Sequence, residues 1–184
     1  MLTIITPCSR QANLPKLFES IQFDKIHQWI IVYDTSRNRK YESLYTENPK
    51  ILECECNAGI SGNPQRNCAI EIVEDGFVYF LDDDNIVHPA LWCLLDVVDS
   101  RFFYTFDQLR NKRTNEILVG NRIELDRIDT AMFLVHRRHI GQIRWANDKY
   151  NADGYFITEL YRDNKDAHKY IEGIGCYYNY LVAK

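Results

Sequence analysis

Three consecutive aspartates that follow a short apolar run are the residues of this sequence best suited to chemistry. Residues 77–81 read Phe-Val-Tyr-Phe-Leu, and Asp82, Asp83 and Asp84 come directly after them. Adjacent carboxylates repel one another unless water or a cation separates them, and their oxygens are ligands that Mg²⁺ and Mn²⁺ prefer. A divalent cation bound there could bridge the carboxylates to a diphosphate. The alternative interpretation is a solvated acidic turn without a ligand.

A glycine-bearing segment upstream has the pattern of an anion-binding loop. Residues 57–67 contain two glycines, and the second is followed by Asn63-Pro64, which predicts a helix N-cap followed by proline in the first turn. A helix N-terminus offers backbone N–H donors and the positive end of a dipole. Arg66 would lie in this first turn and could project toward the aspartates, or it could be an ordinary surface arginine.

The pattern of the elements predicts where these segments lie. Apolar runs alternate with helical patterns over the first hundred residues, which is typical of an α/β fold with a largely parallel sheet. The expected strands are 2–6, 29–33, 51–54 and 77–81, and the expected helices are 14–21, 63–74 and one that begins near residue 89. Ligands bind at the carboxyl ends of such strands. We therefore expect the loop at 6–10, the residue Asp34, the helix start and the aspartates to meet in one cleft.

The second half has weaker patterns. The expected elements are strands at 117–120 and 132–135, a helix at 156–161 and a tyrosine-rich tail at 177–180, which is either a late strand or a docked extension.

Composition limits the classes of protein that remain. The chain has 184 residues, of which 46% are hydrophobic, and 22 basic and 26 acidic residues give a net charge of −4. This sign disfavours nucleic acid and anionic membranes as partners. Because no apolar run is long enough to span a membrane, we expect a soluble cytoplasmic protein. The six cysteines show no C-x-x-C pair, and Cys68 and Cys93 lie in apolar runs, which predicts buried thiols in place of disulfides or a zinc site.

Together these segments resemble the nucleotide-sugar half of GT-A fold glycosyltransferases. The resemblance covers residues 1–95 and rests on four motifs, which are 5–7 with Arg10, 32–34, 65–67 and 79–85. The last two are similar to family 43 glucuronyltransferases, whereas the N-terminus is similar to bacterial or viral family 2 enzymes. The resemblance implies a Rossmann-like α/β fold with a mixed, mostly parallel central sheet flanked by helices. It also implies one domain over 1–184, with a nucleotide-sugar half at 1–100 and an acceptor half at 101–184.

The resemblance further implies a metal-dependent, inverting glycosyltransferase. It would move a sugar from a nucleoside diphosphate, expected to be UDP, to a glycan or another hydroxyl acceptor. Asp84 would bind Mn²⁺ or Mg²⁺ directly, Asp82 would support the metal and also bind the nucleotide sugar, and Asp83 would bind the ribose or assist the metal through water. Asp34 and Arg66 would contact the base. The residues implied to shape the rest of the nucleotide pocket are Thr6, Pro7, Ser9, Arg10 and Gly59.

An inverting transfer needs a general base for the acceptor hydroxyl. In similar enzymes the base is a carboxylate in a short acidic motif before a helix, and Asp153 is the best match, with Glu159 and Asp148 as rivals. The usual Glu-Asp pair is replaced by Ala152-Asp153. Asp153 could instead cap the helix that follows.

Other residues of the second half have two interpretations each. His168 is placed for a late metal ligand or for an exposed face. The aromatic side chains of Trp145, Tyr150 and Tyr155 could stack on a sugar ring or belong to the core.

Two alternatives to the transferase stay open. One is a module that binds a nucleotide sugar without turnover. The other is a haloacid-dehalogenase-like phosphatase, because Asp82 and Asp84 have the spacing of its nucleophile and acid, although no lysine and paired aspartates follow. The short chain also leaves room for additional domains or partner enzymes.

Overall fold

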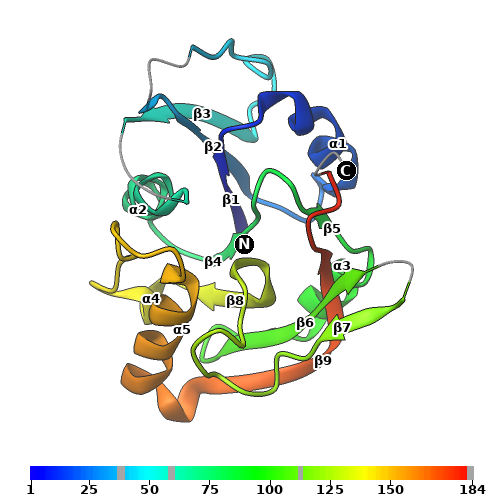
Figure 1. Cartoon of the computed structure of the whole chain (residues 1–184), viewed down its shortest axis with the longest axis vertical. Helices are drawn as coiled ribbons and strands as arrows, with labels where there is room; N and C mark the ends of the chain where they lie inside the picture. Colours follow the sequence, from blue (N-terminus) through cyan, green and yellow to red (C-terminus); the bar gives the residue numbers. More distant parts are fainter. Residues whose placement is uncertain (37–39, 58–60, 112–113, 182–184) are drawn as a thin grey trace.

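The fold is given by a computed structural model that describes residues 1–36, 40–57, 61–111 and 114–181 (Figure 1). The strands are β1 (Leu2–Cys8), β2 (Gln28–Asp34), β3 (Ile51–Cys56), β4 (Phe77–Phe80), β5 (Ile86–Val87), β6 (Phe103–Asn111), β7 (Glu116–Leu118), β8 (Phe133–His136) and β9 (His168–Tyr177). The helices are α1 (Leu14–Ser20), α2 (Asn63–Ile72), α3 (Ala90–Leu94), α4 (Arg137–Ile140) and α5 (Ala152–Asp163), with short 3₁₀ turns between some of them.

Over the described residues, all strands belong to one sheet in the order β3-β2-β1-β4-β8-β6-β9-β5, with β7 paired to β6. Strands β1, β2, β3 and β4 are parallel to their neighbours in this group, whereas β8 joins β4 in the antiparallel direction. The expected α/β fold with a parallel N-terminal half is therefore confirmed. The carboxyl ends of β1, β2 and β4 lie at one edge of the sheet.

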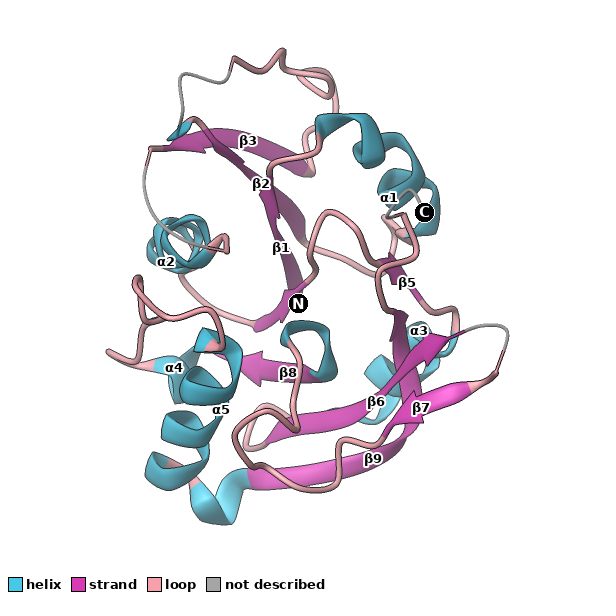
Figure 2. Cartoon of the chain, in the orientation of Figure 1, coloured by secondary structure: helices cyan, strands magenta, loops and turns pink. Residues whose placement is uncertain are grey.

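Helices cover both faces of the sheet, as the views in Figures 1 and 2 show. On one face the strands pack with Leu14 and Leu17 of α1 and with Leu91 of α3. On the other face they pack with Ile70 of α2 and Phe156 of α5. Strands buried on both faces carry apolar side chains at successive positions, which explains the uniformly apolar runs of β2 and β4.

The start of α2 differs from the prediction. Gly62, in the left-handed region with φ 76°, precedes the helix, and Asn63 is its first residue. The side-chain amide of Asn63 donates to the carbonyl oxygens of Ala146 and Lys149, at 2.9 and 2.8 Å. The expectation of an Asn63 cap is therefore wrong, because this side chain binds the second half of the chain instead. The proline in the first turn is confirmed.

The second half contains two long strands that the sequence pattern does not predict. Strand β6 lies between β8 and β9, and it pairs with β9 in parallel, with Phe103 opposite His168. The expected strands at 117–120 and 132–135 correspond to β7 and β8, and the expected helix is α5, which begins at Ala152. The tail is both strand and extension, since β9 ends at Tyr177 and the next residues dock on other segments.

The cysteines are only partly buried, contrary to the prediction. Cys8 and Cys176 are buried, but Cys68 and Cys93 are exposed because they lie on the outer faces of α2 and α3.

None of the helices in the described part of the chain is long and apolar enough to cross a membrane.

Candidate functional site

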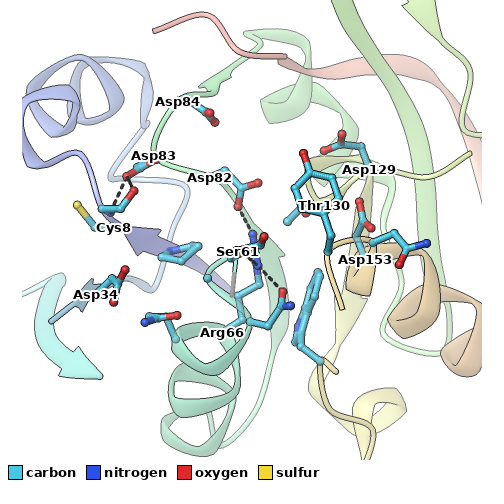
Figure 3. A pocket seen from close by; sticks show the side chains of 18 of the residues that line it. Cys8, Asp34, Ser61, Arg66, Asp82, Asp83, Asp84, Asp129, Thr130 and Asp153 are labelled. Atoms are coloured by element: carbon cyan, nitrogen blue, oxygen red, sulfur yellow. Dashed lines mark hydrogen bonds and ion pairs between the residues drawn. The ribbon is translucent and has the colours of Figure 1, made fainter. Parts of the chain in front are cut away.

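A pocket of about 850 Å³ lies at the carboxyl edge of the sheet. It is lined by the loop after β1, the end of β2, the start of α2 and the residues after β4, and on the opposite side by segments of the second half (Figure 3). The sequence-predicted residues that it brings together are Pro7, Ser9, Arg10, Asp34, Arg66, Asp82, Asp83, Asp84 and Asp153. Gly59, which the resemblance also implies, lies outside the described residues.

Thr6 does not line the pocket, so its expected contact with the nucleotide sugar is wrong. Its side chain is fully buried, and its hydroxyl accepts a hydrogen bond from the indole Nε1 of Trp29 at 2.9 Å. The chain reaches the pocket one residue later, at Pro7. Successive side chains of a strand point to opposite faces, which is why these neighbours differ in environment.

Asp83 connects two loops of the site. Its carboxylate is 2% exposed and accepts hydrogen bonds from the backbone N–H groups of Ser9 and Arg10, both at 2.7 Å. The guanidinium of Arg10 binds its other oxygen through Nε at 2.8 Å. Because the loop donors engage both oxygens, Asp83 is best explained as the residue that positions the loop after β1.

Asp82 forms an ion pair with Arg66. The side chain of Arg66 is 4% exposed, and its guanidinium carbon lies 4.5 Å from the ring centroid of Trp145. Its Nη1 also donates to the carbonyl oxygen of Ser61 at 2.8 Å. Arg66 therefore faces the aspartates, as expected from its place in the first turn of α2, and Figure 3 shows it pointing toward Asp82. Its guanidinium offsets the charge of Asp82 inside the pocket.

Asp84 lies at the pocket beside Arg10, whose Nη2 is 2.8 Å from its Oδ2. Burial and the neighbouring charge of Asp82 raise the pKa of Asp84 to about 6. The tail holds this residue from outside, because the N–H of Leu181 donates to the Asp84 carbonyl oxygen at 2.9 Å. In addition, the N–H of Asn179 donates to the side chain of Asn85 at 2.8 Å.

The charge of the pocket favours a cation. The described lining residues include seven aspartates and three arginines, which gives a formal charge of −4. Among the described residues, no group of three or more His, Cys, Asp or Glu side chains is arranged to hold a metal ion. Asp82 and Asp84 nevertheless fit a site of the Mg²⁺ type, in which one or two carboxylates bind the ion and phosphate or water oxygens complete its coordination.

The second half contributes its own carboxylates. Asp153 lies in the first turn of α5, where burial raises its pKa and its Oδ1 accepts the Gly154 N–H at 2.8 Å. Its side chain therefore contacts the helix start and also faces the pocket (Figure 3). The rivals Asp148 and Glu159 do not line this pocket.

Asp129 and Arg110 line the pocket but are missed by the sequence analysis. Asp129 precedes a 3₁₀ turn at Thr130–Met132 and accepts the N–H of Met132 in a capping box. Burial, together with the charges of Asp82 and Asp153, raises the pKa of Asp129 to about 6. Its Oδ2 lies 3.5 Å from Nη2 of Arg110. An aspartate before an apolar run is a helix-cap signal, and only the fold shows that this one faces the aspartate triplet.

The other predicted residues of the second half differ in whether they line the pocket. His168 is partly buried at the start of β9, bonds the hydroxyl of Thr105 at 2.9 Å and does not line the pocket, so neither of its predicted placements is observed. Trp145 belongs to the core and also lines the pocket. Tyr150 lines the pocket with 88% of its surface exposed, whereas Tyr155 lies outside it.

No protein-family model and no curated protein match the sequence. Solved structures do match. The chain is similar to S. aureus TarS residues 1–349 in complex with UDP, with a TM-score of 0.74, 17% identity, and coverage of 96% of this chain and 59% of that one. It is also similar to the complex of the same protein with UDP-GlcNAc, with a TM-score of 0.73, 16% identity, and coverage of 96% and 57%. The chain thus spans less than two thirds of those structures. TarS is a GT-A-type glycosyltransferase, and this chain has the GT-A fold.

Proposed function

We propose that this chain is a glycosyltransferase that moves a sugar from UDP to a hydroxyl acceptor such as a glycan. The observation that carries the proposal is the pairing of Asp82 and Asp84 with two arginines at the carboxyl end of β4, within a pocket of about 850 Å³. TarS, whose fold is similar, has been solved with UDP and with UDP-GlcNAc. The likeness in fold supports a UDP-sugar as the donor to test first.

The residues of the first half would hold the donor. Asp34, at the end of β2, and Gln65, buried in the first turn of α2, line the part of the pocket proposed for the base. The loop after β1 would contact the nucleotide through Pro7 and Ser9, and its position depends on Asp83. Arg10 and Arg66 bring positive charge to the side proposed for the diphosphate.

A divalent cation, Mn²⁺ or Mg²⁺, belongs to the proposal. Asp84 and Asp82 would hold it, and Lewis-acid stabilisation of the departing diphosphate is the chemistry that such an ion supplies when bound. Without it, an anionic diphosphate would enter a pocket whose described side chains carry a formal charge of −4. This charge already includes Arg10 and Arg66, so the cation would supply positive charge that the arginines do not.

Asp153 is the proposed general base of an inverting reaction. It lies across the pocket from the aspartate triplet (Figure 3), where an acceptor hydroxyl could approach the sugar from the face opposite the diphosphate. Asp129 lines the same side of the pocket. It is the weaker candidate for the general base because its carboxylate is paired with Arg110. Tyr150, at the exposed rim, offers an aromatic face to a sugar acceptor.

Calorimetric titration with UDP, GDP and dTDP, each with and without Mn²⁺, tests the binding part of the proposal. We expect UDP to bind best and to bind more tightly with the cation, and UDP to be released slowly from UDP-GlcNAc when water is the acceptor. If none of the nucleotides binds, the proposal fails. Binding of UDP without turnover of any UDP-sugar would favour the module without catalysis, and release of phosphate from simple phosphoesters would favour the phosphatase.

A further inference from the structure

Two cysteines lie in contact behind the wall of the pocket proposed for the base. Cys56 is the last residue of β3, and Cys68 lies in the middle of α2. Their sulfur atoms are 2.8 Å apart, with the Cys68 thiol donating to the Cys56 sulfur. Cys68 is exposed and Cys56 is half-buried, so a small molecule in solution can reach the pair.

We propose that Cys56 and Cys68 form a reversible disulfide, and that this bond fixes the pocket wall that carries Gln65 and Arg66. The two sulfurs need to approach by only about 0.8 Å to reach the bond length of a disulfide. The functional part of this inference rests on the proposed nucleotide site, whereas the bond itself does not.

The position of the pair connects it to the pocket. The Cys56 carbonyl oxygen accepts hydrogen bonds from Nε2 of Gln65 at 3.2 Å and from the N–H of Thr35 at 3.4 Å. Opposite Cys56 in the sheet lies Asp34, which lines the pocket. Eleven residues separate the two cysteines, and Ser61, Gly62, Gln65 and Arg66 among them line the pocket. A bond between the sulfurs would close this stretch into a covalent loop.

The chemistry needs a two-electron oxidant, and we name a small-molecule disulfide such as oxidised glutathione. The exposed Cys68 thiolate attacks one sulfur of that disulfide, which forms a mixed disulfide and releases one thiol. The Cys56 thiolate then attacks the Cys68 sulfur and releases the second thiol. The protein loses two electrons and two protons, and the small-molecule disulfide gains them as it becomes two thiols.

The surroundings of the sulfurs agree with this order of attack. Burial, followed by the hydrogen bond and charge of Cys68, raises the pKa of Cys56 to about 12. The contribution of Cys68 disappears once its sulfur is in a mixed disulfide, so Cys56 becomes more reactive at the second step. Cys8 and Cys176 are poorer candidates because both thiols are buried, whereas Cys68 is exposed and in contact with Cys56. Cys54 directs its S–H toward the Ile31 carbonyl oxygen at 3.8 Å.

Peptide mass mapping of the full chain tests the bond. The reduced protein is equilibrated with mixtures of oxidised and reduced glutathione, and the remaining thiols are alkylated before digestion. We expect a Cys56–Cys68 crosslink and the loss of two alkylated thiols in the wild type. Cys93→Ser is the matched control, because it removes another exposed helix thiol and should leave the crosslink intact. In Cys56→Ser, the mixed disulfide on Cys68 should accumulate. A wild type that only accumulates this mixed disulfide, or that links other cysteines, would overturn the proposal.

Titration with UDP and Mn²⁺ tests the effect on the pocket wall. Fixing a wall before the ligand binds reduces the ordering cost of binding, so the Kd of the oxidised wild type should be about two- to tenfold lower than that of the reduced form. Cys93→Ser should show the same change and Cys68→Ser none. An unchanged Kd in a protein with a mapped crosslink would overturn the link to the wall. If UDP binds neither form, the proposed function fails, and the mapping result still decides the bond.

Discussion

The carboxylate of Asp83 accepts three hydrogen bonds from Arg10, from the backbone N–H at 2.7 Å, from the side-chain Nε at 2.8 Å and from Nη2 at 2.5 Å. The two residues are far apart in sequence, and each follows a strand of the parallel half of the sheet. The contact therefore fixes the loop after β1 against the residues that follow β4. The charge of Asp83, the central residue of the triplet, therefore positions a loop.

Replacing Asp83 by Asn should lower the free energy of unfolding of the protein. The amide keeps one acceptor oxygen but places an NH₂ group either against the backbone N–H donors of Ser9 and Arg10 or against the Arg10 guanidinium. We expect the free energy of unfolding to fall by about 2–3 kcal/mol, measured by urea unfolding at pH 7. Asp96→Asn removes an exposed carboxylate paired with Lys25 and should cost at most about 1 kcal/mol. Equal losses in the two variants would contradict the role of Asp83.

Much of the parallel half could be predicted because its signals are local. The run at 77–81 is apolar at every position since β4 is buried on both faces, and the spacing of Leu14 and Leu17 gives one face of α1. The aspartates then fall at the carboxyl end of a central strand by connectivity alone. For the same reason, the expected meeting of the triplet, Asp34 and Arg66 in one pocket is confirmed.

The rest depends on partners that are distant in sequence. Strand β6 pairs with β9, more than sixty residues away in sequence. No local hydrophobic pattern in either segment predicts this pairing. Asn63 has the sequence pattern of a cap, yet its amide binds carbonyl groups near residue 146. The site depends on distant partners in the same way. Thr6 is buried against Trp29 and so does not line the pocket. The turn before β8 places Asp129 in the pocket.

Removing the charge of Asp84 should separate metal-dependent from metal-free binding. In Asp84→Asn, the affinity for UDP with Mn²⁺ should fall about tenfold or more, because the proposed cation loses an anionic ligand. Without Mn²⁺, UDP should bind at least as well as to the wild type, since one negative charge has left a pocket with a formal charge of −4. Calorimetric titration measures both values.

Asp126→Asn provides the matched control for this prediction. Asp126 lines the same pocket and is exposed, and its removal changes the pocket charge by the same amount without touching the triplet. The metal-dependent gain in UDP affinity should persist in this variant. An equal loss of that gain in both variants would show that charge alone, and not ligation by Asp84, decides binding.

Asp153→Asn should abolish turnover while leaving UDP binding nearly unchanged. A general base contributes about 10²–10⁴-fold to rate, so UDP release from UDP-GlcNAc should fall by that factor. Burial raises the pKa of Asp153, and the base must be ionised to act. The acid limb of the wild-type pH–rate profile should therefore lie above the ordinary aspartate pKa of about 3.9. Asp148→Asn and Glu159→Gln alter carboxylates outside the pocket and should keep full activity. An active Asp153→Asn enzyme would move the role to another carboxylate, with Asp129 next in line.

Asp129→Asn should stabilise the protein, and the gain should depend on pH. Burial raises the pKa of Asp129 to about 6 in the folded state, whereas an unfolded aspartate has a pKa of about 3.9. The folded state therefore binds the proton more tightly, and ionisation destabilises it as the pH rises from about 4 to about 6. The asparagine side chain can still accept the Met132 N–H but carries no charge. We expect the free energy of unfolding of the variant to exceed that of the wild type by about 1–2 kcal/mol at pH 7.5 and to match it near pH 3.5. Urea unfolding at both pH values measures this difference, and a gain of the same size at both would mean that the charge of Asp129 is not its cause.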